Sequence, residues 1–126
     1  MNYDTRVLLI DDDFAVCEAL KRVLTSEDFQ VLTTNCSQEA LLICEKDEID
    51  VVLLDLNLGN EDGWKLFELL KELRPDLPII VISAHADRLA DSHSHRASGV
   101  LEKPFDVSTL LALMDRTAPS EGQRVG

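Results

Sequence analysis

The sequence predicts a single-domain α/β fold in which five strand–helix units form a parallel sheet with helices on both faces. Short apolar runs rich in Val, Ile and Leu alternate with segments of helical spacing, and they cover residues 6–10, 29–34, 50–55, 77–83 and 99–102. Several of these runs are apolar at consecutive positions, which is typical of strands covered on both faces. The alternation favours right-handed crossover connections and therefore a doubly wound parallel sheet.

Helices are indicated between these runs by apolar residues that recur at steps of three and four. One such set is Phe14, Cys17, Leu20 and Leu24, and another is Leu66, Leu69, Leu70 and Leu73. Ser37 and Asp106 occupy positions where helix N-caps are expected. Pro75 and Pro78 end the third helix before the fourth strand begins. The helix expected at about 86–96 has the weakest pattern, because the segment is polar and has few apolar anchors.

Composition narrows the possible partners and location. The chain has 126 residues, 45% of them hydrophobic, which excludes a mainly disordered protein. Its 24 acidic and 12 Lys and Arg residues give a net charge of -12, which disfavours direct binding to nucleic acid or an anionic membrane. The 3 cysteines lack CxxC spacing, and no apolar run reaches the ~20 residues of a membrane span. We therefore expect a cytoplasmic protein with reduced cysteines.

Polar side chains follow four of the predicted strands. In a parallel sheet the carboxyl ends of the strands meet at one edge, where ligands bind near the switch in strand order. We expect the following residues to converge there: Asp11, Asp12 and Asp13 after the first strand, Asp55 after the third, Ser83 after the fourth and Lys103 after the fifth.

These residue types favour phosphoryl chemistry. Carboxylates at close quarters repel one another unless a cation joins them, and Mg²⁺ takes a few carboxylate oxygens while keeping water ligands. A hydroxyl and an ammonium opposite the carboxylates suit a tetrahedral phosphoryl group, whose outer oxygens need donors. Alternatively, the acidic run at 11–13 caps the following helix, and we expect Asp13 to do so.

Four motifs carry a resemblance to a known family: LLIDDD (8–13), LLDLNLGNEDG (53–63), IIVISA (79–84) and EKPF (102–105). In this order and spacing, over residues 5 to 117, the chain resembles the receiver domain of bacterial two-component response regulators. The resemblance implies a flavodoxin-like fold with strand order 2-1-3-4-5. It also implies a receiver domain at residues 1–117 and a flexible tail at 118–126.

The resemblance assigns roles to the residues at the sheet edge. Asp55 resembles the aspartate that accepts the phosphoryl group. Asp12 resembles the direct Mg²⁺ ligand and Asp11 its partner, which acts partly through water. The backbone carbonyl of Asn57 would complete the metal shell.

Ser83 and Lys103 match the family's switch hydroxyl and lysine, and the peptide between Lys103 and Pro104 is expected to be cis. The implied function is to take a phosphoryl group from a sensor histidine kinase or histidine phosphotransfer protein. Phosphorylation would then switch binding to a downstream protein or output domain that the sequence does not identify. The chain would be a signalling receiver, capable at most of self-phosphorylation and autodephosphorylation, rather than a turnover enzyme.

The chain departs from the family pattern at several positions. Gly59 stands where proline is common and is expected to loosen the loop after the third strand. Gly63, which is not a departure, ends that loop and is expected to let the backbone bend freely. Val100 replaces the usual aromatic switch residue, and the spacing from Ser83 to Lys103 is two residues short.

Two alternatives remain open. One is a Mg²⁺-dependent phosphohydrolase with an aspartyl-phosphate intermediate, although such enzymes place a second Asp where this chain has Asn57. The other is a pseudo-receiver that binds partners without phosphate, against which the complete set of site residues argues.

Overall fold

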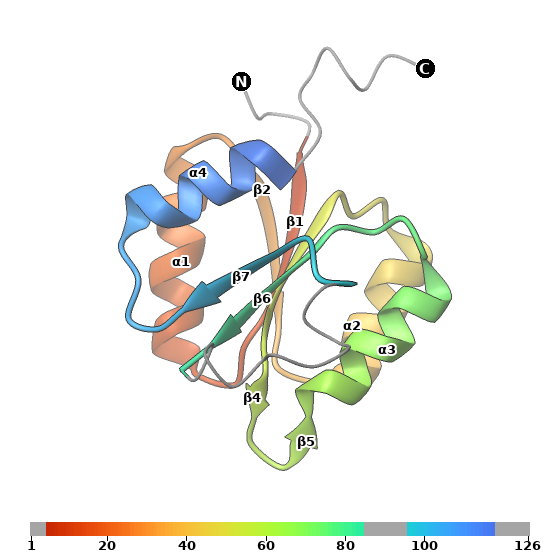
Figure 1. Cartoon of the computed structure of the whole chain (residues 1–126). Helices are drawn as coiled ribbons and strands as arrows, with labels where there is room; N and C mark the ends of the chain where they lie inside the picture. Colours follow the sequence, from red (N-terminus) through yellow and green to blue (C-terminus); the bar gives the residue numbers. More distant parts are fainter. Residues whose placement is uncertain (1–4, 85–95, 118–126) are drawn as a thin grey trace.

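A five-stranded parallel sheet forms the centre of the protein, seen here in a computed structural model that describes residues 5–84 and 96–117 (Figure 1). Its strands are β1 (Arg6–Ile10), β2 (Gln30–Thr34), β3 (Val51–Asp55), β6 (Ile79–Ser83) and β7 (Gly99–Glu102). They lie in the order β2-β1-β3-β6-β7, and all neighbouring pairs are parallel. Counted along the chain, this is the order 2-1-3-4-5, so the predicted fold class is confirmed.

Helices cover both faces of the sheet. They are α1 (Phe14–Ser26), α2 (Ser37–Lys46), α3 (Gly63–Leu73) and α4 (Val107–Thr117). Figure 1 shows α1 and α4 on one face and α2 and α3 on the other. The helix predicted at 86–96 and the tail predicted at 118–126 fall outside the described residues, apart from residue 96. No helix in the described part of the chain is long and apolar enough to cross a membrane.

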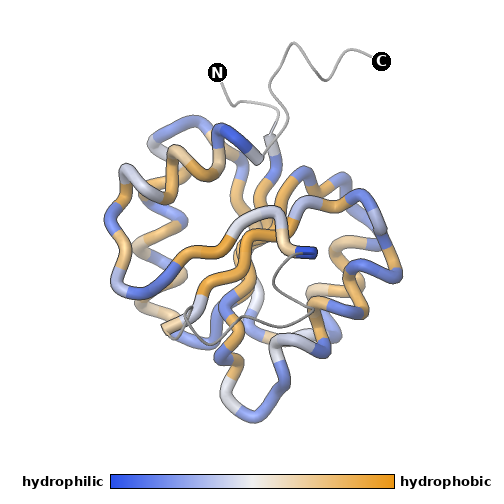
Figure 2. The backbone as a smooth tube through the Cα atoms, in the orientation of Figure 1, coloured by the Kyte–Doolittle hydropathy of each residue, from blue (hydrophilic) through white to orange (hydrophobic). Residues whose placement is uncertain are grey.

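Successive side chains of each strand point to opposite faces of the sheet, so each face has its own hydrophobic core. Leu9 packs with Leu24 and Leu110 beneath α1 and α4, whereas its neighbour Leu8 packs with Phe67 beneath α2 and α3. All of these side chains are fully buried, and burying each contributes roughly 1.5–3 kcal/mol. The central strands are accordingly hydrophobic along their length in Figure 2. Burial on both faces therefore explains the continuous apolar runs in the sequence.

The cysteines are free, and two of them are core residues. Cys17 and Cys44 are buried, while Cys36 is half-buried. Burial raises the pKa of both the Cys17 and Cys44 thiols to about 11, with nearby carboxylates adding to the effect at Cys17. Both thiols are therefore protonated and inert at neutral pH, as expected for small buried side chains.

Two of the three predicted helix caps are correct. Asp13 accepts hydrogen bonds from two amides in the first turn of α1, and Asp106 accepts one from the first turn of α4. The prediction of Ser37 as an N-cap is wrong, because Cys36 occupies that position and Ser37 is the first residue of α2. The amide and hydroxyl of Ser37 instead donate to Glu61, a carboxylate from a distant segment.

A small hairpin follows β3 and was not predicted. β4 (Asn57–Leu58) pairs antiparallel with β5 (Glu61–Asp62). Gly59 is the first of the two residues between these strands and has a φ of 64°, as the first central residue of a type II′ turn requires. The left-handed backbone of Gly59 thus closes the hairpin, and the expectation that Gly59 loosens this loop stays a prediction.

Gly63 joins the hairpin to α3, and the reason for glycine here is close approach. A Cβ atom at this position would lie 2.4 Å from the backbone oxygen of Leu56 and 2.6 Å from its Cα. The backbone of Gly63 is not among the positive-φ residues of the described chain. Contact between two backbone segments, rather than the free bending expected from the sequence, therefore requires glycine.

Gly63→Ala is expected to lower the free energy of unfolding by roughly 2–3 kcal/mol, because the backbone of Leu56 cannot move away without disturbing β3. Gly99→Ala is the matched control. The three atoms that an added Cβ would approach most closely there all belong to the side chain of Leu113, the nearest at 2.8 Å, and a side chain can shift more readily than backbone. Urea unfolding should show the larger loss for Gly63→Ala, and equal losses would contradict this account of the close approach.

Candidate functional site

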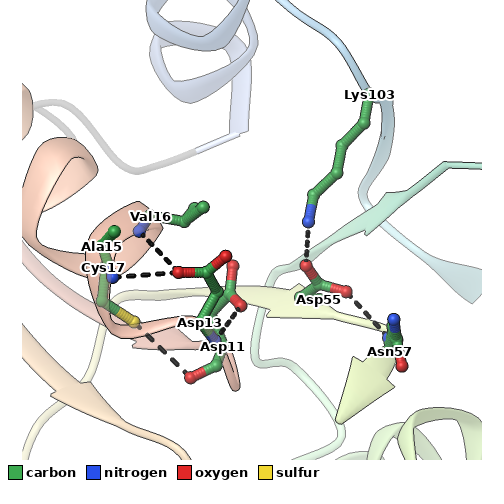
Figure 3. Close-up of polar contacts among 8 residues, drawn as sticks. All are labelled: Asp11, Asp13, Ala15, Val16, Cys17, Asp55, Asn57 and Lys103. Carbon is green, nitrogen blue, oxygen red and sulfur yellow. Dashed lines mark hydrogen bonds and ion pairs between the residues drawn. The ribbon is translucent and has the colours of Figure 1, made fainter. Parts of the chain in front are cut away.

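Asp55 is the last residue of β3 and is almost fully buried, with 2% of its surface exposed. One carboxylate oxygen accepts a hydrogen bond of 2.7 Å from the backbone N–H of Asn57. The other pairs with the ammonium of Lys103, which follows β7. In Figure 3 the carboxylate lies between these two donors. Two segments far apart in the sequence therefore orient a single buried carboxylate.

Asp11 lies just beyond β1 and is also 2% exposed. Its Oδ1 accepts a 2.9 Å hydrogen bond from the amide of Asp13, whereas its Oδ2 is buried and has no hydrogen-bond partner in the described chain. Burial, together with the neighbouring carboxylate of Asp55, raises the pKa of Asp11 to about 6 against the opposing effects of the Asp13 amide and the Lys103 charge. The site therefore contains a buried carboxylate oxygen that has no hydrogen-bond partner in the described chain and that the charge of Lys103 compensates only in part.

Lys103 supplies the positive charge of the site. Burial alone would lower the pKa of its ammonium, but the hydrogen bond and charge of Asp55, together with Asp11 and Asp13, raise the pKa overall. Its backbone N–H donates to the carbonyl of Ser83 at 2.9 Å, which joins the ends of β6 and β7. The peptide between Lys103 and Pro104 is cis, as predicted. The side chain is therefore charged and directed at Asp55.

The remaining predicted residues lie at the same edge of the sheet. Ser83 ends β6, one residue beyond Ile82, which pairs with Asp55 in the β3–β6 ladder. Asp12 is exposed and lies beside the hairpin, where a Cβ on Gly59 would be 3.0 Å from its Oδ2.

The carboxylates are not gathered into a closed metal site. Among residues 5–84 and 96–117, no group of three or more His, Cys, Asp or Glu side chains could hold a metal ion. The available side-chain donors are nevertheless hard oxygens: the open Oδ2 of Asp11 and the exposed carboxylate of Asp12. A hollow of about 240 Å³ between α1 and the end of β2 is lined by Asp11 and Asp12. This donor set fits Mg²⁺, which accepts few carboxylates and keeps its waters.

Sequence reasoning missed two features of the site. It assigned Asn57 only a carbonyl role, whereas the N–H of Asn57 holds Asp55. It also missed Glu61, which fixes the hairpin to the start of α2. The dipeptide Gly-Asn at 59–60 was the available signal, because such a pair between two short segments indicates a hairpin.

Comparison with known proteins identifies the class of protein to which this fold and site belong. The response regulator receiver domain family matches residues 7–115, and the chain belongs to that family. It is a signal-transduction domain.

Individual relatives agree with this assignment. The chain is 36% identical over 128 residues to the response regulator MprA of Mycolicibacterium vanbaalenii, covering 93% of this chain and 53% of that protein. It is 31% identical over 125 residues to the transcriptional regulatory protein GlrR of Escherichia coli, covering 94% of this chain and 28% of that protein. The chain therefore spans about a quarter to a half of the length of these curated relatives.

Among solved structures, the response regulator TrrA of Thermotoga maritima superposes with a TM-score of 0.82 at 25% identity, covering 89% of this chain and 97% of that one. That structure is a complex with Mg²⁺ and BeF. TrrA has also been solved in complex with the histidine kinase ThkA, and that copy superposes with a TM-score of 0.81.

Asp11→Asn is expected to raise the free energy of unfolding by about 1–2 kcal/mol in the presence of a chelator, because it removes a buried charge that Lys103 and the amide of Asp13 compensate only in part. The Asn oxygen can still accept from the amide of Asp13. Asp12→Asn makes the same charge change on an exposed side chain and should alter stability by no more than about 0.5 kcal/mol. Urea unfolding measures both, and a destabilised Asp11→Asn variant would show that the Asp11 carboxylate is satisfied in the folded protein.

Proposed function

We propose that Asp55 of this receiver domain accepts a phosphoryl group from a histidine kinase or histidine phosphotransfer protein in a Mg²⁺-dependent reaction. The observation that carries the proposal is the Asp55 carboxylate itself. It is buried at a strand end, oriented by Asn57 and Lys103, and adjacent to Asp11, one of whose carboxylate oxygens is buried without a hydrogen-bond partner in the described chain. A carboxylate placed only for solubility would be exposed and free to rotate.

In the proposed reaction, an oxygen of Asp55 attacks the phosphorus atom of a phosphohistidine. A P–O bond forms as the P–N bond breaks, and the imidazole nitrogen retains the electron pair. The oxygen that forms the new bond loses negative charge and weakens its contact with its present donor, while the second donor holds the remaining oxygen. If the attacking oxygen is the one paired with Lys103, the ammonium is released to contact the phosphoryl oxygens.

We assign the Mg²⁺ ligands to Asp11, Asp12, Asp55 and the backbone carbonyl of Asn57. When bound, the ion supplies the positive charge that offsets repulsion between these carboxylates and the incoming phosphoryl group. The open Oδ2 of Asp11 supports this assignment, and so does the presence of Mg²⁺ and BeF in the complex of TrrA.

Ser83 is assigned as the hydroxyl that contacts the phosphoryl group, since it ends the strand next to Asp55. Movement of Ser83 and Lys103 towards the new charge would alter the surface around β6 and β7 and thereby change partner binding. The half-exposed Val100 on β7 has no aromatic ring to turn, so the change must be transmitted by other side chains.

The proposed protein partners are a sensor histidine kinase or phosphotransfer protein upstream and a downstream protein or output domain. The complex of TrrA with ThkA supports the first. The net charge of -12 argues against direct contact with nucleic acid or membrane by this domain. We place the receiver unit at residues 1–117, in the cytoplasm, acting as a switch rather than as a turnover enzyme.

Incubation with Mg²⁺ and a small acyl phosphate, followed by intact mass, tests the function. The proposal predicts a single added phosphoryl group on the wild-type chain. Continuous release of phosphate would indicate a phosphohydrolase, and an unchanged mass with Mg²⁺ present would indicate a pseudo-receiver.

Asp55→Asn is expected to abolish phosphoryl uptake while leaving the fold intact, because the amide has nearly the same shape but is not a nucleophile. Asp76→Asn is the matched control, since it removes one charge from an exposed carboxylate between α3 and β6. Intact mass should show the added phosphoryl group on the control and none on Asp55→Asn. Uptake by Asp55→Asn at the wild-type rate would exclude Asp55 as the acceptor.

A further inference from the structure

A single carboxylate joins the β4–β5 hairpin to the start of α2. The two oxygens of Glu61 accept from Ser37, one from the backbone N–H at 3.1 Å and the other from the hydroxyl at 2.6 Å. These hydrogen bonds lower the pKa of Glu61. A carboxylate is also favoured at the N-terminus of a helix, where the backbone N–H groups are unpaired. Both oxygens are engaged, so the contact fixes the direction of the hairpin as well as its distance from α2.

The same hairpin reaches the proposed phosphoryl site through its backbone. Glu61 lies opposite Leu58 in the β4–β5 ladder, and Leu58 directly follows Asn57. The N–H of Asn57 holds one oxygen of Asp55 at 2.7 Å. A shift of β5 would therefore be passed to β4 and from there to the Asp55 carboxylate.

The turn of the hairpin lies against the second carboxylate of the site. A Cβ on Gly59 would be 3.0 Å from Oδ2 of Asp12, so the turn and this side chain are already close together. The hairpin thus borders both Asp55 and Asp12, which are the proposed acceptor and a proposed metal ligand.

So short a hairpin cannot hold this position by itself. Its strands have two residues each, and an isolated pair of strands is marginally stable even when it is longer. The buried side chain of Leu58 anchors the β4 side in the core. The β5 side is exposed. Its end is held where Asp62 caps α3 and Gly63 approaches the backbone of Leu56, and the contact of Glu61 with Ser37 ties it to α2.

We propose that the Glu61–Ser37 contact is a clamp that positions Asn57, Asp55 and Asp12 for Mg²⁺ binding and phosphoryl transfer. Glu61 is in this sense a positioning residue, since it touches neither the metal ligands nor the reacting atoms. The inference rests on the proposed function, because it concerns the same site. A purely structural role, in which Glu61 stabilises the start of α2, is the competing explanation.

Calorimetric titration with Mg²⁺ separates the two explanations. In Glu61→Ala, which loses both hydrogen bonds, we expect the Kd for Mg²⁺ to rise roughly five- to tenfold. Glu61→Gln keeps an oxygen for the Ser37 amide and should recover to within about twofold of the wild type. Glu68→Ala is the matched control, because it removes the same charge from a partly exposed side chain on α3 and breaks an ion pair with Arg96. Its Kd should equal that of the wild type.

Gly59→Ala disturbs the hairpin from its other side without a change of charge. Its φ of 64° is strained for alanine, and the added Cβ meets Asp12. We expect a comparable rise in the Kd for Mg²⁺, although this change also touches Asp12 directly. Ser37→Ala, which removes the hydroxyl donor of the contact and leaves the site residues untouched, decides the question if Glu61→Ala does not fold, and a wild-type Kd in Ser37→Ala would then overturn the clamp. Thermal melts in chelator verify that each variant is folded at the titration temperature, and the single Trp64, just after the hairpin, reports its local environment.

A Kd for Glu61→Ala within twofold of the wild type would overturn the clamp, whatever happens to stability. An equal rise in Glu68→Ala would overturn it as well, because charge alone would then explain the effect. The wild type is tested separately for phosphoryl uptake by intact mass. Failure of the wild type to take up phosphate counts against the proposed function, whereas wild-type uptake with an unchanged Kd in Glu61→Ala counts against the clamp alone.

Discussion

The arrangement at the carboxyl edge of the sheet depends on how the buried Asp55 carboxylate is stabilised. An ionised carboxylate out of contact with water is costly unless charges or hydrogen-bond donors compensate it. Lys103 supplies the charge and Asn57 the N–H group. The charge of Lys103 also lowers the pKa of Asp11, so the same ammonium partly compensates both carboxylates. A reaction that neutralises the oxygen of Asp55 paired with Lys103 must therefore change the position that Lys103 prefers.

The strand order brings these groups together. β1 and β3 are neighbours, with Ile10 opposite Leu54, so the residues that follow them, Asp11 and Asp55, come to lie side by side. β6 and β7 follow on the other side of β3, which brings Ser83 and Lys103 to the same edge. The helices that connect the strands pack against the core residues on the two faces of the sheet. The position of the site is therefore set by the core rather than by flexible loops.

Much of this could be predicted from local sequence. The apolar runs identify the strands because both faces are buried, and the polar residues that end them, such as Asp55 and Lys103, identify the edge. Contacts between distant side chains could not be predicted. Ser37 was taken for an N-cap because nothing local shows that Glu61 engages its donors. The burial of individual side chains could not be predicted either. The sequence alone does not show that Asp11 is buried with an oxygen that lacks a hydrogen-bond partner in the described chain, whereas Asp12 is exposed.

The central claim is that Asp55, held by Lys103 and Asn57, is the residue that accepts the phosphoryl group. The most direct measurement is to phosphorylate the wild-type chain with Mg²⁺ and acyl phosphate, reduce the acyl phosphate with borohydride, and locate the reduced residue by peptide fragmentation. The account predicts homoserine at position 55 and an unmodified aspartate at positions 11, 12 and 13. Reduction at one of those three aspartates, or a phosphoryl group on a histidine, would contradict it.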